Sequence, residues 1–205
     1  PTSKAAIYTQ PIKVTKDTQV KAVVFKNGAQ VGKVTQKSFF VNKATGKSTS
    51  SNVAYRFKPD NPGAKDYSEF NFCGLTNGIR GYLNHVHPWV AFKPAQYTEI
   101  IVDLDTITSF HKIRYGVMNG YGQEAVAPES VDIEISNDSI SFKRIASKNK
   151  WQMFEQKFNF EPQKARYVKL RFKNGKLPHK LGGFPVPEKR EGELGLLFID
   201  EIEIK

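Results

Sequence analysis

Two histidines, His85 and His87, are separated by a single residue and could together bind a metal ion. On a β-strand, residues two positions apart face the same side, so both imidazoles could reach one zinc ion. Zinc needs at least one further protein ligand, and the other two histidines, His111 and His179, are distant in the sequence. Pro88 follows directly and suits a loop or an edge strand. A polar loop with partly exposed histidines is the simpler interpretation, and the metal site stays an alternative.

The stretch around these histidines also supplies the groups that a sugar pocket needs. A sugar presents a face of C–H groups and a ring of hydroxyls, so its pocket combines an aromatic ring with fixed donors and acceptors. Within ten residues the candidates are Arg80, Tyr82, Asn84, His85, His87 and Trp89. Later loops could add Asn119, Tyr121, Gln123, His179 and Phe184. Trp89 has an alternative role as a core residue, because it opens an apolar run that ends at Phe92.

Three acidic residues, Asp200, Glu201 and Glu203, lie close together near the C-terminus. A glycosidase uses two carboxyl groups about 5–9 Å apart across a cleft, usually from different elements. On a single strand Asp200 faces away from the other two, and no partner acid is evident elsewhere in the sequence. We therefore do not expect this chain to be an enzyme by itself.

The net charge of +11 is concentrated in the N-terminal part of the chain. Residues 1–47 contain nine lysines and a single acid, Asp17. Most of these lysines alternate with apolar residues, as on solvated strand faces, and are not interleaved with aromatics as in single-strand nucleic-acid binders. No apolar run approaches the ~20 residues that span a bilayer. We therefore expect neither a nucleic-acid partner nor a membrane span.

The elements that must position the candidate residues read as β-strands throughout. Thr18–Phe25 and the apolar run that follows are joined by Asn27 and Gly28, a strong hairpin signal. Ser130–Ser136 alternates apolar and polar residues, as a half-buried strand does. Further strands are expected over Thr98–Leu104, His111–Met118, Arg166–Phe172 and Leu196–Ile204. At least seven strands with short turns and no helical periodicity predict an all-β sandwich.

Three longer stretches interrupt this regular pattern, at residues 55–88, 118–130 and 174–195. Long loops in a compact sandwich are either functional or disordered. If the three loops meet at one end of the sandwich, they line a shallow site that contains the sugar-pocket candidates.

The order of several motifs resembles a known pair of domains. The runs LTNGIRG, IIVDL, SVDIEISNDSISFKRI, RYVKLRF and GLLFIDEIEI occur in the order seen in the discoidin-like β-sandwich. That group is also called the coagulation-factor type C domain, and it includes carbohydrate-binding modules of family 32. The opening, from PTSKAAIYTQ to GKVTQKSF, resembles the small fibronectin-III-like module of bacterial chitobiases, with its first strand missing. The resemblance divides the chain into a truncated fibronectin-like module (1–44), a linker (45–52) and a galactose-binding-like, or discoidin, jelly-roll sandwich (53–205).

In this order the two domains resemble the non-catalytic tail of a bacterial family 20 β-N-acetylhexosaminidase. The resemblance implies binding of a glycan of the galactose or N-acetylhexosamine type, beside a catalytic domain of the same polypeptide. It also implies a periplasmic, cell-surface or extracellular location, although the first residues lack the apolar core of a secretion signal. Two alternatives stay open: a spacer that packs on the catalytic domain without a ligand, or a protein–protein adaptor.

The resemblance also implies a structural calcium ion. In this sequence the matching positions are Asn77 and Glu201, with the backbone carbonyls of Leu75 and Ile79. Calcium takes six to eight oxygen ligands and prefers carboxylates, so an asparagine at the first position keeps an oxygen but loses a charge. The alternatives are a turn role for Asn77 before Gly78 and a solvated strand-end role for Glu201.

Overall fold

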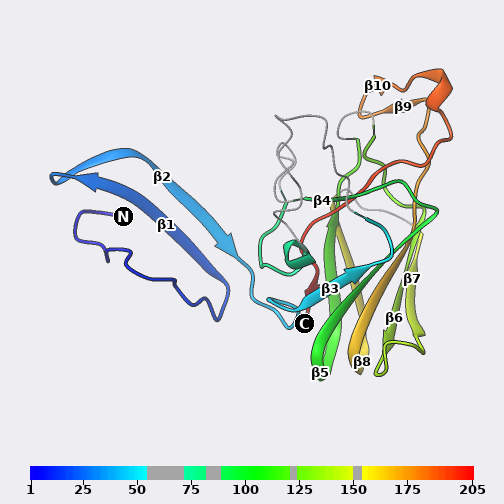
Figure 1. The fold of residues 1–205 in the computed structure, drawn as a ribbon, viewed down its shortest axis with the longest axis horizontal. Helices are drawn as coiled ribbons and strands as arrows, with labels where there is room; N and C mark the ends of the chain where they lie inside the picture. Colours follow the sequence, from blue (N-terminus) through cyan, green and yellow to red (C-terminus); the bar gives the residue numbers. More distant parts are fainter. Residues whose placement is uncertain (55–71, 82–88, 121–123, 150–153) are drawn as a thin grey trace.

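The computed structural model describes residues 1–54, 72–81, 89–120, 124–149 and 154–205, and its elements are nearly all β-strands. A small N-terminal hairpin projects from a larger sandwich (Figure 1). The strands are β1 (Thr18–Lys26), β2 (Ala29–Phe39), β3 (Ser48–Ser51), β4 (Val90–Phe92), β5 (Tyr97–Val117), β6 (Ser130–Ser136), β7 (Lys143–Lys148), β8 (Phe154–Lys173), β9 (Lys180–Leu181), β10 (Phe184–Pro185), β11 (Leu197–Ile199) and β12 (Glu203–Ile204). The described ranges also contain the short 3-10 helices η2 (Phe72–Leu75) and η3 (Glu188–Arg190). No helix in these ranges is long and apolar enough to cross a membrane.

The predicted hairpin is confirmed by the pairing of β1 with β2. Asn27 and Gly28 form its tight turn with positive φ angles of 50° and 78°, a backbone conformation that favours asparagine and glycine. Beyond the hairpin, the backbone N–H of Phe40 donates to the carbonyl of Gly78 at 2.8 Å. The hairpin is therefore joined to the sandwich at the loop that follows η2.

The sandwich is one continuous eight-stranded sheet in the order β4-β11-β5-β8-β6-β7, with β3 and β12 also pairing with β5. The long strands β5 and β8 pair twice, once over Tyr97–Asp103 and again over Thr108–Val117 of β5. Between these halves Asp105 has a positive φ of 67° and the register shifts. This break lets the sheet bend over on itself and enclose the core (Figure 1).

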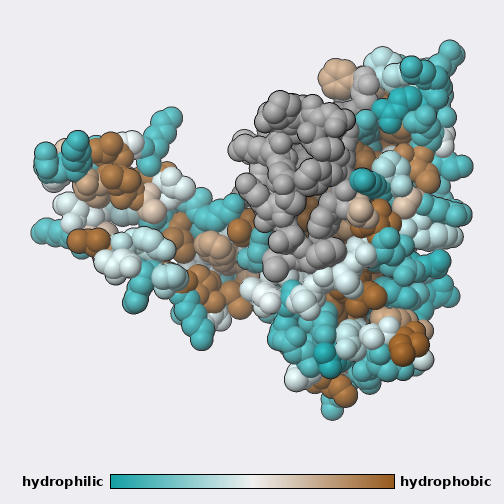
Figure 2. Space-filling model, in the orientation of Figure 1, coloured by the Kyte–Doolittle hydropathy of each residue, from teal (hydrophilic) through white to brown (hydrophobic). Residues whose placement is uncertain are grey.

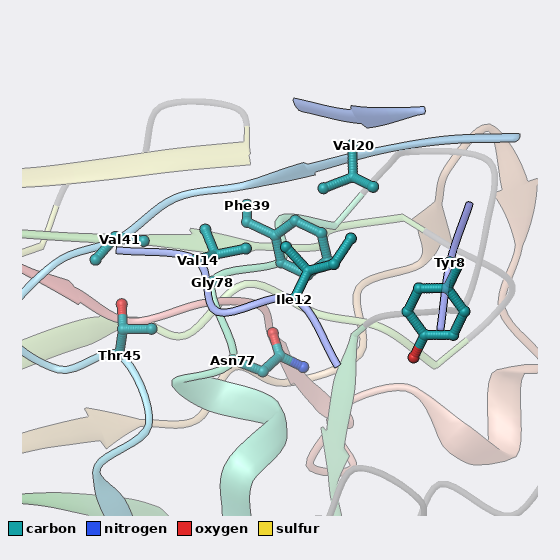
Figure 3. Close-up of a pocket in the computed structure, with 9 residues that line it drawn as sticks. All are labelled: Tyr8, Ile12, Val14, Val20, Phe39, Val41, Thr45, Asn77 and Gly78. Atoms are coloured by element: carbon teal, nitrogen blue, oxygen red, sulfur yellow. The ribbon is translucent and has the colours of Figure 1, made fainter. Parts of the chain in front are cut away.

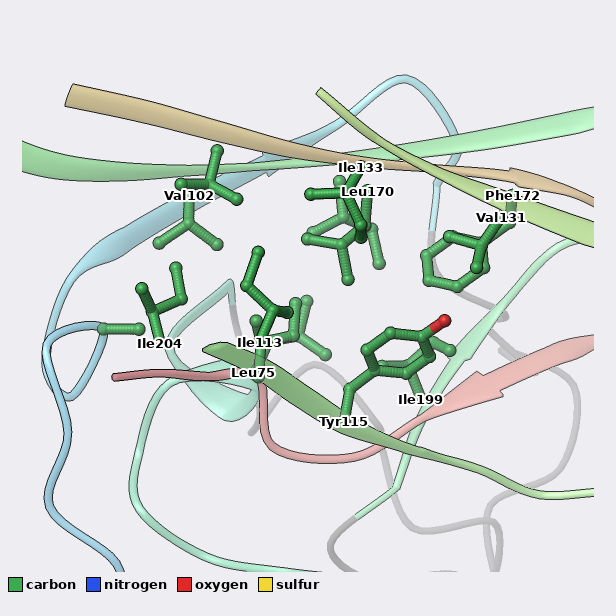
Figure 4. Close-up of a cluster of buried hydrophobic side chains, with 14 of the residues drawn as sticks. Leu75, Val102, Ile113, Tyr115, Val131, Ile133, Leu170, Phe172, Ile199 and Ile204 are labelled. Carbon is green, nitrogen blue, oxygen red and sulfur yellow. The ribbon is translucent and has the colours of Figure 1, made fainter. Parts of the chain in front are cut away.

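Alternating side chains from both parts of the sheet fill the core. Val131 and Ile133 of β6 face the interior, as the sequence predicts. They pack in one core cluster with inward-facing residues of β5 and of the predicted Arg166–Phe172 run (Figure 4). These fully buried residues are Ile113, Tyr115, Val168, Leu170 and Phe172. The period-two alternation in the sequence thus identifies the buried face correctly.

Two elements differ from the sequence expectation. The predicted linker over 45–52 contains β3, which pairs with β5 through Ser48–Ser51, while the adjacent Ala44 is fully buried in the core. The sequence does not predict this strand, because its small polar residues lack the alternation of apolar and polar residues that indicates a half-buried strand. The final strand is split into β11 and β12, since the chain leaves the ladder at Asp200–Ile202 to place its acidic side chains inside the protein.

Candidate functional site

Trp89 lies in the core and is only 2% exposed. It belongs to a second apolar cluster, apart from the main core, with Ala91, Met118, Ala125, Leu196 and Phe198. Its indole ring also lies tightly against Gly81, where an added Cβ would come within 2.3 Å of the ring. The hypothesis of a solvent-facing aromatic plate at Trp89 is therefore wrong, and the core alternative holds.

A cavity of about 230 Å³ with several charged residues in its lining opens beside this tryptophan. It is lined by Arg80, Gly81, Trp89, Arg114, Gly116, Phe154, Glu155 and Asp200. The lining combines the partly exposed Phe154 with two guanidinium groups and two carboxylates, a mixture that can recognise a hydroxyl-bearing ring, whereas Trp89 is buried. Of the predicted sugar-pocket residues, the structure brings Arg80 and Trp89 to this cavity.

The floor of the cavity is a buried ion pair between Arg80 and Asp200. Nη1 of Arg80 lies 3.0 Å from Oδ1 of Asp200, and the backbone N–H of Gly81 donates to the other carboxylate oxygen at 3.1 Å. The backbone N–H of Gly116 donates to Oδ1 as well. Burial raises the pKa of Asp200 to about 6, and the charge of Arg80 together with these hydrogen bonds opposes the shift.

Glu155 and Arg114 lie at the open side of the cavity. Nη1 of Arg114 lies 3.2 Å from Glu155, and its Nη2 lies 2.6 Å from the buried Glu203. The Glu155 side chain is 38% exposed and also pairs with Lys157. Burial opposes ionisation of Glu155, but the Lys157 hydrogen bond and the nearby arginines keep its pKa below the usual value. Glu155 is therefore an ionised acceptor that a ligand can reach.

Phe154 adopts a strained backbone at the rim of the cavity. Its φ is +69°, in the left-handed region that bulky residues rarely enter. Such strain costs about 1–3 kcal/mol and gathers at functional sites, where the surrounding structure holds it in place. Phe154 lines the cavity together with Arg114 and Glu155.

Two of the three long loops meet, but neither contributes a residue to the lining of the cavity, so the expected shallow site formed by all three loops is not seen in the described residues. Gly120 and Gly182 touch so closely that a Cβ at Gly182 would lie 2.1 Å from the carbonyl oxygen of Gly120. Arg190 of the last loop also pairs with Glu124 of the middle loop at 3.1 Å. Phe184 lies on this last loop, is 63% exposed, and does not line the cavity.

Of the remaining sugar-pocket candidates, the structure describes Asn119 and His179, and neither lines the cavity. Tyr82, Asn84, His85, His87, Tyr121 and Gln123 lie outside the described residues. The side-chain oxygen of Asn119 accepts a hydrogen bond from the backbone of Ala127 at 2.9 Å and so stabilises its own loop. His179 is exposed and lies 2.5 Å from Glu191.

Glu201 is fully buried, which excludes a solvated strand-end role. Neither carboxylate oxygen has a hydrogen-bond partner of good geometry among the described residues. Burial raises its pKa to about 9, an effect that the backbone N–H of Gly78 offsets only in part. A carboxylate that is buried without a well-placed hydrogen-bond partner is a suitable ligand for a cation, because the cation would compensate its negative charge.

The loop beside Glu201 offers mainly backbone oxygens to such a cation. The carbonyl of Leu75 accepts from the N–H of Ile202 at 2.6 Å, which places the loop next to the glutamate. The side-chain oxygen of Asn77 accepts from the N–H of Ile79 at 2.9 Å, as in an asparagine turn. Over the described ranges, no three His, Cys, Asp or Glu side chains cluster to hold a metal ion, so carbonyl ligands are essential here.

Sequence reasoning missed Arg114, Phe154, Glu155 and Asp200 as cavity residues. Asp200 had a usable signal, because it interrupts an apolar run that otherwise reads as a core strand. Arg114 and Glu155 had none: each is an ordinary outward-facing charge on a strand. They become neighbours only because β5 and β8 pair, with Gly116 opposite Glu155.

A second hollow of about 310 Å³ lies between the hairpin and the sandwich (Figure 3). Its lining includes Tyr8, Ile12, Val14, Val20, Phe39 and Val41, with Thr45, Asn77 and Gly78 from the sandwich side. This lining contains no charged side chain, so it lacks the fixed polar groups that orient a sugar. The cavity beside Trp89 is the better candidate.

Comparisons with known proteins agree with this architecture. A Streptococcus pneumoniae fucose binding module, SpX-3, aligns with a TM-score of 0.52 and 12% identity over 81% of this chain and 98% of its own. Another fucose binding module from that organism gives 0.50 and 16%, over 88% and 98% of the two chains. Chitosan-binding module 1 of a Paenibacillus sp. IK-5 chitosanase/glucanase gives 0.49 and 14%, over 80% and 98%. Identities this low establish the fold alone.

Sequence comparison gives the family. No curated protein matches the chain significantly. Residues 1–39 match the "Fn3 associated" family, which covers the hairpin and the segment before it. Residues 72–181 match the F5/8 type C domain and include the main strands of the sandwich. With more than half of its length matched and a discoidin jelly-roll fold, this chain belongs to the F5/8 type C domain family.

Proposed function

We propose that the sandwich binds a glycan non-covalently in the cavity beside Trp89. The observation that carries the proposal is a partly exposed aromatic ring, that of Phe154, beside ionised groups in one cavity of about 230 Å³. Phe154 can pack on the C–H face of a sugar ring, while Arg114 donates to hydroxyls and Glu155 accepts from them. The carbohydrate-binding modules that share the fold support this function.

The affinity is expected to be weak, because a small cavity buries little of its ligand. Weak sites are useful when they are tethered, since tethering raises the local concentration of the bound partner. We propose that this chain targets a glycoside hydrolase, a β-N-acetylhexosaminidase of the chitobiase type, to its substrate. Such a role places the protein in the periplasm, on the cell surface or outside the cell, where these glycans occur.

Isothermal titration with galactose, fucose, N-acetylgalactosamine and N-acetylglucosamine tests the proposal directly. At least one sugar should bind, and Glu155→Gln should weaken it about tenfold, since hydrogen bonds to charged groups contribute about 1.5–3 kcal/mol. Glu129→Gln is the matched control: its side chain is 43% exposed and pairs with Lys173, but it does not line the cavity. Equal weakening by both variants, or no binding at millimolar sugar, contradicts the proposal.

We further propose that Glu201 and the oxygens of Leu75, Asn77 and Ile79 hold a structural calcium ion. Calcium would neutralise a buried carboxylate that has no hydrogen-bond partner of good geometry among the described residues, so it would stabilise the folded chain and not the unfolded one. Adding calcium after chelation should raise the melting temperature of the wild type but not of Glu201→Gln. An unchanged melting temperature in the wild type, with no binding by calorimetry, refutes this site.

A further inference from the structure

The projecting part of the molecule, residues 1–41, is called the arm below, and it is strongly basic. It carries seven lysines against one acid, Asp17, a side-chain balance of +6 within the chain's +11. Oδ1 of Asp17 accepts a hydrogen bond from the backbone N–H of Val41 at 2.9 Å. Within the described structure, none of the seven lysines forms an ion pair, whereas the sandwich lysines Lys169 and Lys173 pair with glutamates.

Four of these lysines lie on the hairpin, two on each strand, and the other three precede it. Six of the seven lysines are exposed, and Lys37 is half-buried. Figure 2 shows hydrophilic residues along the edges and tip of the arm, with apolar residues between them. Repulsion among like charges so close together costs free energy, and an anionic partner would relieve it.

The lysines lie on both faces of the hairpin. Val20 and Lys37 are cross-strand partners, so they share one face. Lys21 is the next residue along β1 and therefore points to the opposite face, where its partner is Gln36. A flat membrane surface can touch only one of these faces, whereas a flexible linear polymer can contact both.

The same hairpin is poorly suited to binding another β-strand. Its register shifts between Ala22 and Val24, and Gly32 on the facing strand has a positive φ of 80°. Bulges and lysines at a sheet edge are devices that prevent pairing with a further strand. The partner is therefore one that contacts side chains and does not need backbone hydrogen bonds.

Exposed valines accompany the lysines. Val24 and Val31 are cross-strand partners on one face, and they are 64% and 49% exposed. A polysaccharide with carboxylate or sulfate groups presents anionic charges and C–H faces together, which fits lysines beside valines. Single-stranded nucleic acids instead need a series of aromatic platforms for their bases. In the arm Tyr8 is the one strongly exposed aromatic residue, at 72%, whereas Phe25, Phe39 and Phe40 are half-buried.

We propose that the arm is a second binding surface, for a linear anionic polysaccharide that bears carboxylate or sulfate groups. The interaction is electrostatic, with contributions from Lys21, Lys26, Lys33 and Lys37 on the hairpin. This surface is independent of the cavity in the sandwich. The arm binds the polymer chain, and the cavity binds a single sugar residue.

Affinity electrophoresis of the full chain in gels with polygalacturonate, dextran sulfate or neutral dextran tests this proposal. The two anionic polymers should retard the protein and neutral dextran should not. Binding should weaken at least tenfold between about 50 mM and about 200 mM NaCl, because each neutralised charge releases counterions. The variant with Lys21, Lys26, Lys33 and Lys37 all changed to glutamine should lose most of the retardation.

The matched control changes four exposed sandwich lysines to glutamine and so lowers the net charge equally: Lys143, Lys164, Lys180 and Lys189. It should bind the polymers as the wild type does. Equal loss in both variants means that overall charge alone attracts the polymer, and overturns the proposal. So does tighter binding to double-stranded DNA or to phosphatidylserine vesicles in parallel assays. Glu155→Gln should leave retardation unchanged, which separates this surface from the cavity.

Discussion

Arg80 and Asp200 form an ion pair 3.0 Å apart although 120 positions of sequence separate them. The pair joins the loop after η2 to the last segment of the chain, and the same guanidinium also lies 2.9 Å from Glu203. It therefore closes the floor of the candidate cavity and binds the C-terminal segment to the sandwich. The first prediction concerns the stability that this pair contributes.

Arg80→Met should destabilise the protein by about 3–5 kcal/mol, because it leaves Asp200 buried with no opposite charge in contact. Urea unfolding measures the change. Arg144→Met is the control. Arg144 is 64% exposed, and its Nη1 lies 3.6 Å from Asp132, so this ion pair is longer and more exposed than the pair of Arg80 with Asp200. Exposed pairs contribute about 0–1 kcal/mol, so a similar loss in both variants would show that the buried pair has no special role.

Trp89→Ala should cost about 3–5 kcal/mol, the usual loss when a large core aromatic is truncated. The reason is its place in the apolar cluster with Met118 and Phe198. Thermal unfolding followed by circular dichroism gives the change in stability. A variant as stable as the wild type would mean that Trp89 is not packed in this apolar cluster.

Gly182→Ala should separate the two loops that meet at Gly120. Gly182 and Gly183 both have positive φ, 59° and 85°, so alanine is strained at either position. Only at Gly182 does the added Cβ collide with backbone; at Gly183 nothing lies within 4 Å. The melting temperature should therefore fall further for Gly182→Ala than for Gly183→Ala. Equal shifts would argue against the loop contact.

Asp138 should titrate with a pKa of about 2. The hydroxyl of Ser136 donates to it at 2.7 Å, and the N–H groups of Ile140 and Ser141 add further donors. A depressed folded-state pKa stabilises the protein at pH values above the unfolded pKa of 3.8, and this contribution disappears as the pH falls through about 2.

NMR titration of the Asp138 carboxyl checks the value. Ser136→Ala removes the largest contribution and should raise the pKa more than Ser141→Ala, whose hydroxyl contributes least. The reverse order would contradict the turn geometry.

Much of the fold could be predicted from the sequence because strand alternation is a local signal. Ser130–Ser136 and Arg166–Phe172 show their inward faces directly as alternating apolar residues. The Asn27–Gly28 turn is equally local, because two adjacent residues decide it. β3 escaped prediction because its four residues, STSS, become a strand only through pairing with β5.

The cavity was harder to predict, because its residues meet through long-range pairing. The chemistry of Arg80 makes it a candidate, but its partners Asp200 and Glu203 lie more than a hundred residues away. The aromatic ring of Trp89 makes it a candidate too, and its burial depends on Met118, Ala125 and Leu196 from other segments. No spacing rule connects such residues, so chemistry alone suggests the candidates and the fold selects among them.

The most direct test of the account is an NMR titration of the isotope-labelled chain with the sugars named above. Binding in the cavity predicts that the backbone amides of Gly81, Gly116 and Glu155 shift together and saturate at millimolar sugar. Amides of the β9–β10 hairpin and of the arm should stay in place. Saturable shifts confined to those other regions, or no shifts with any sugar, would contradict the claim that this cavity binds a glycan.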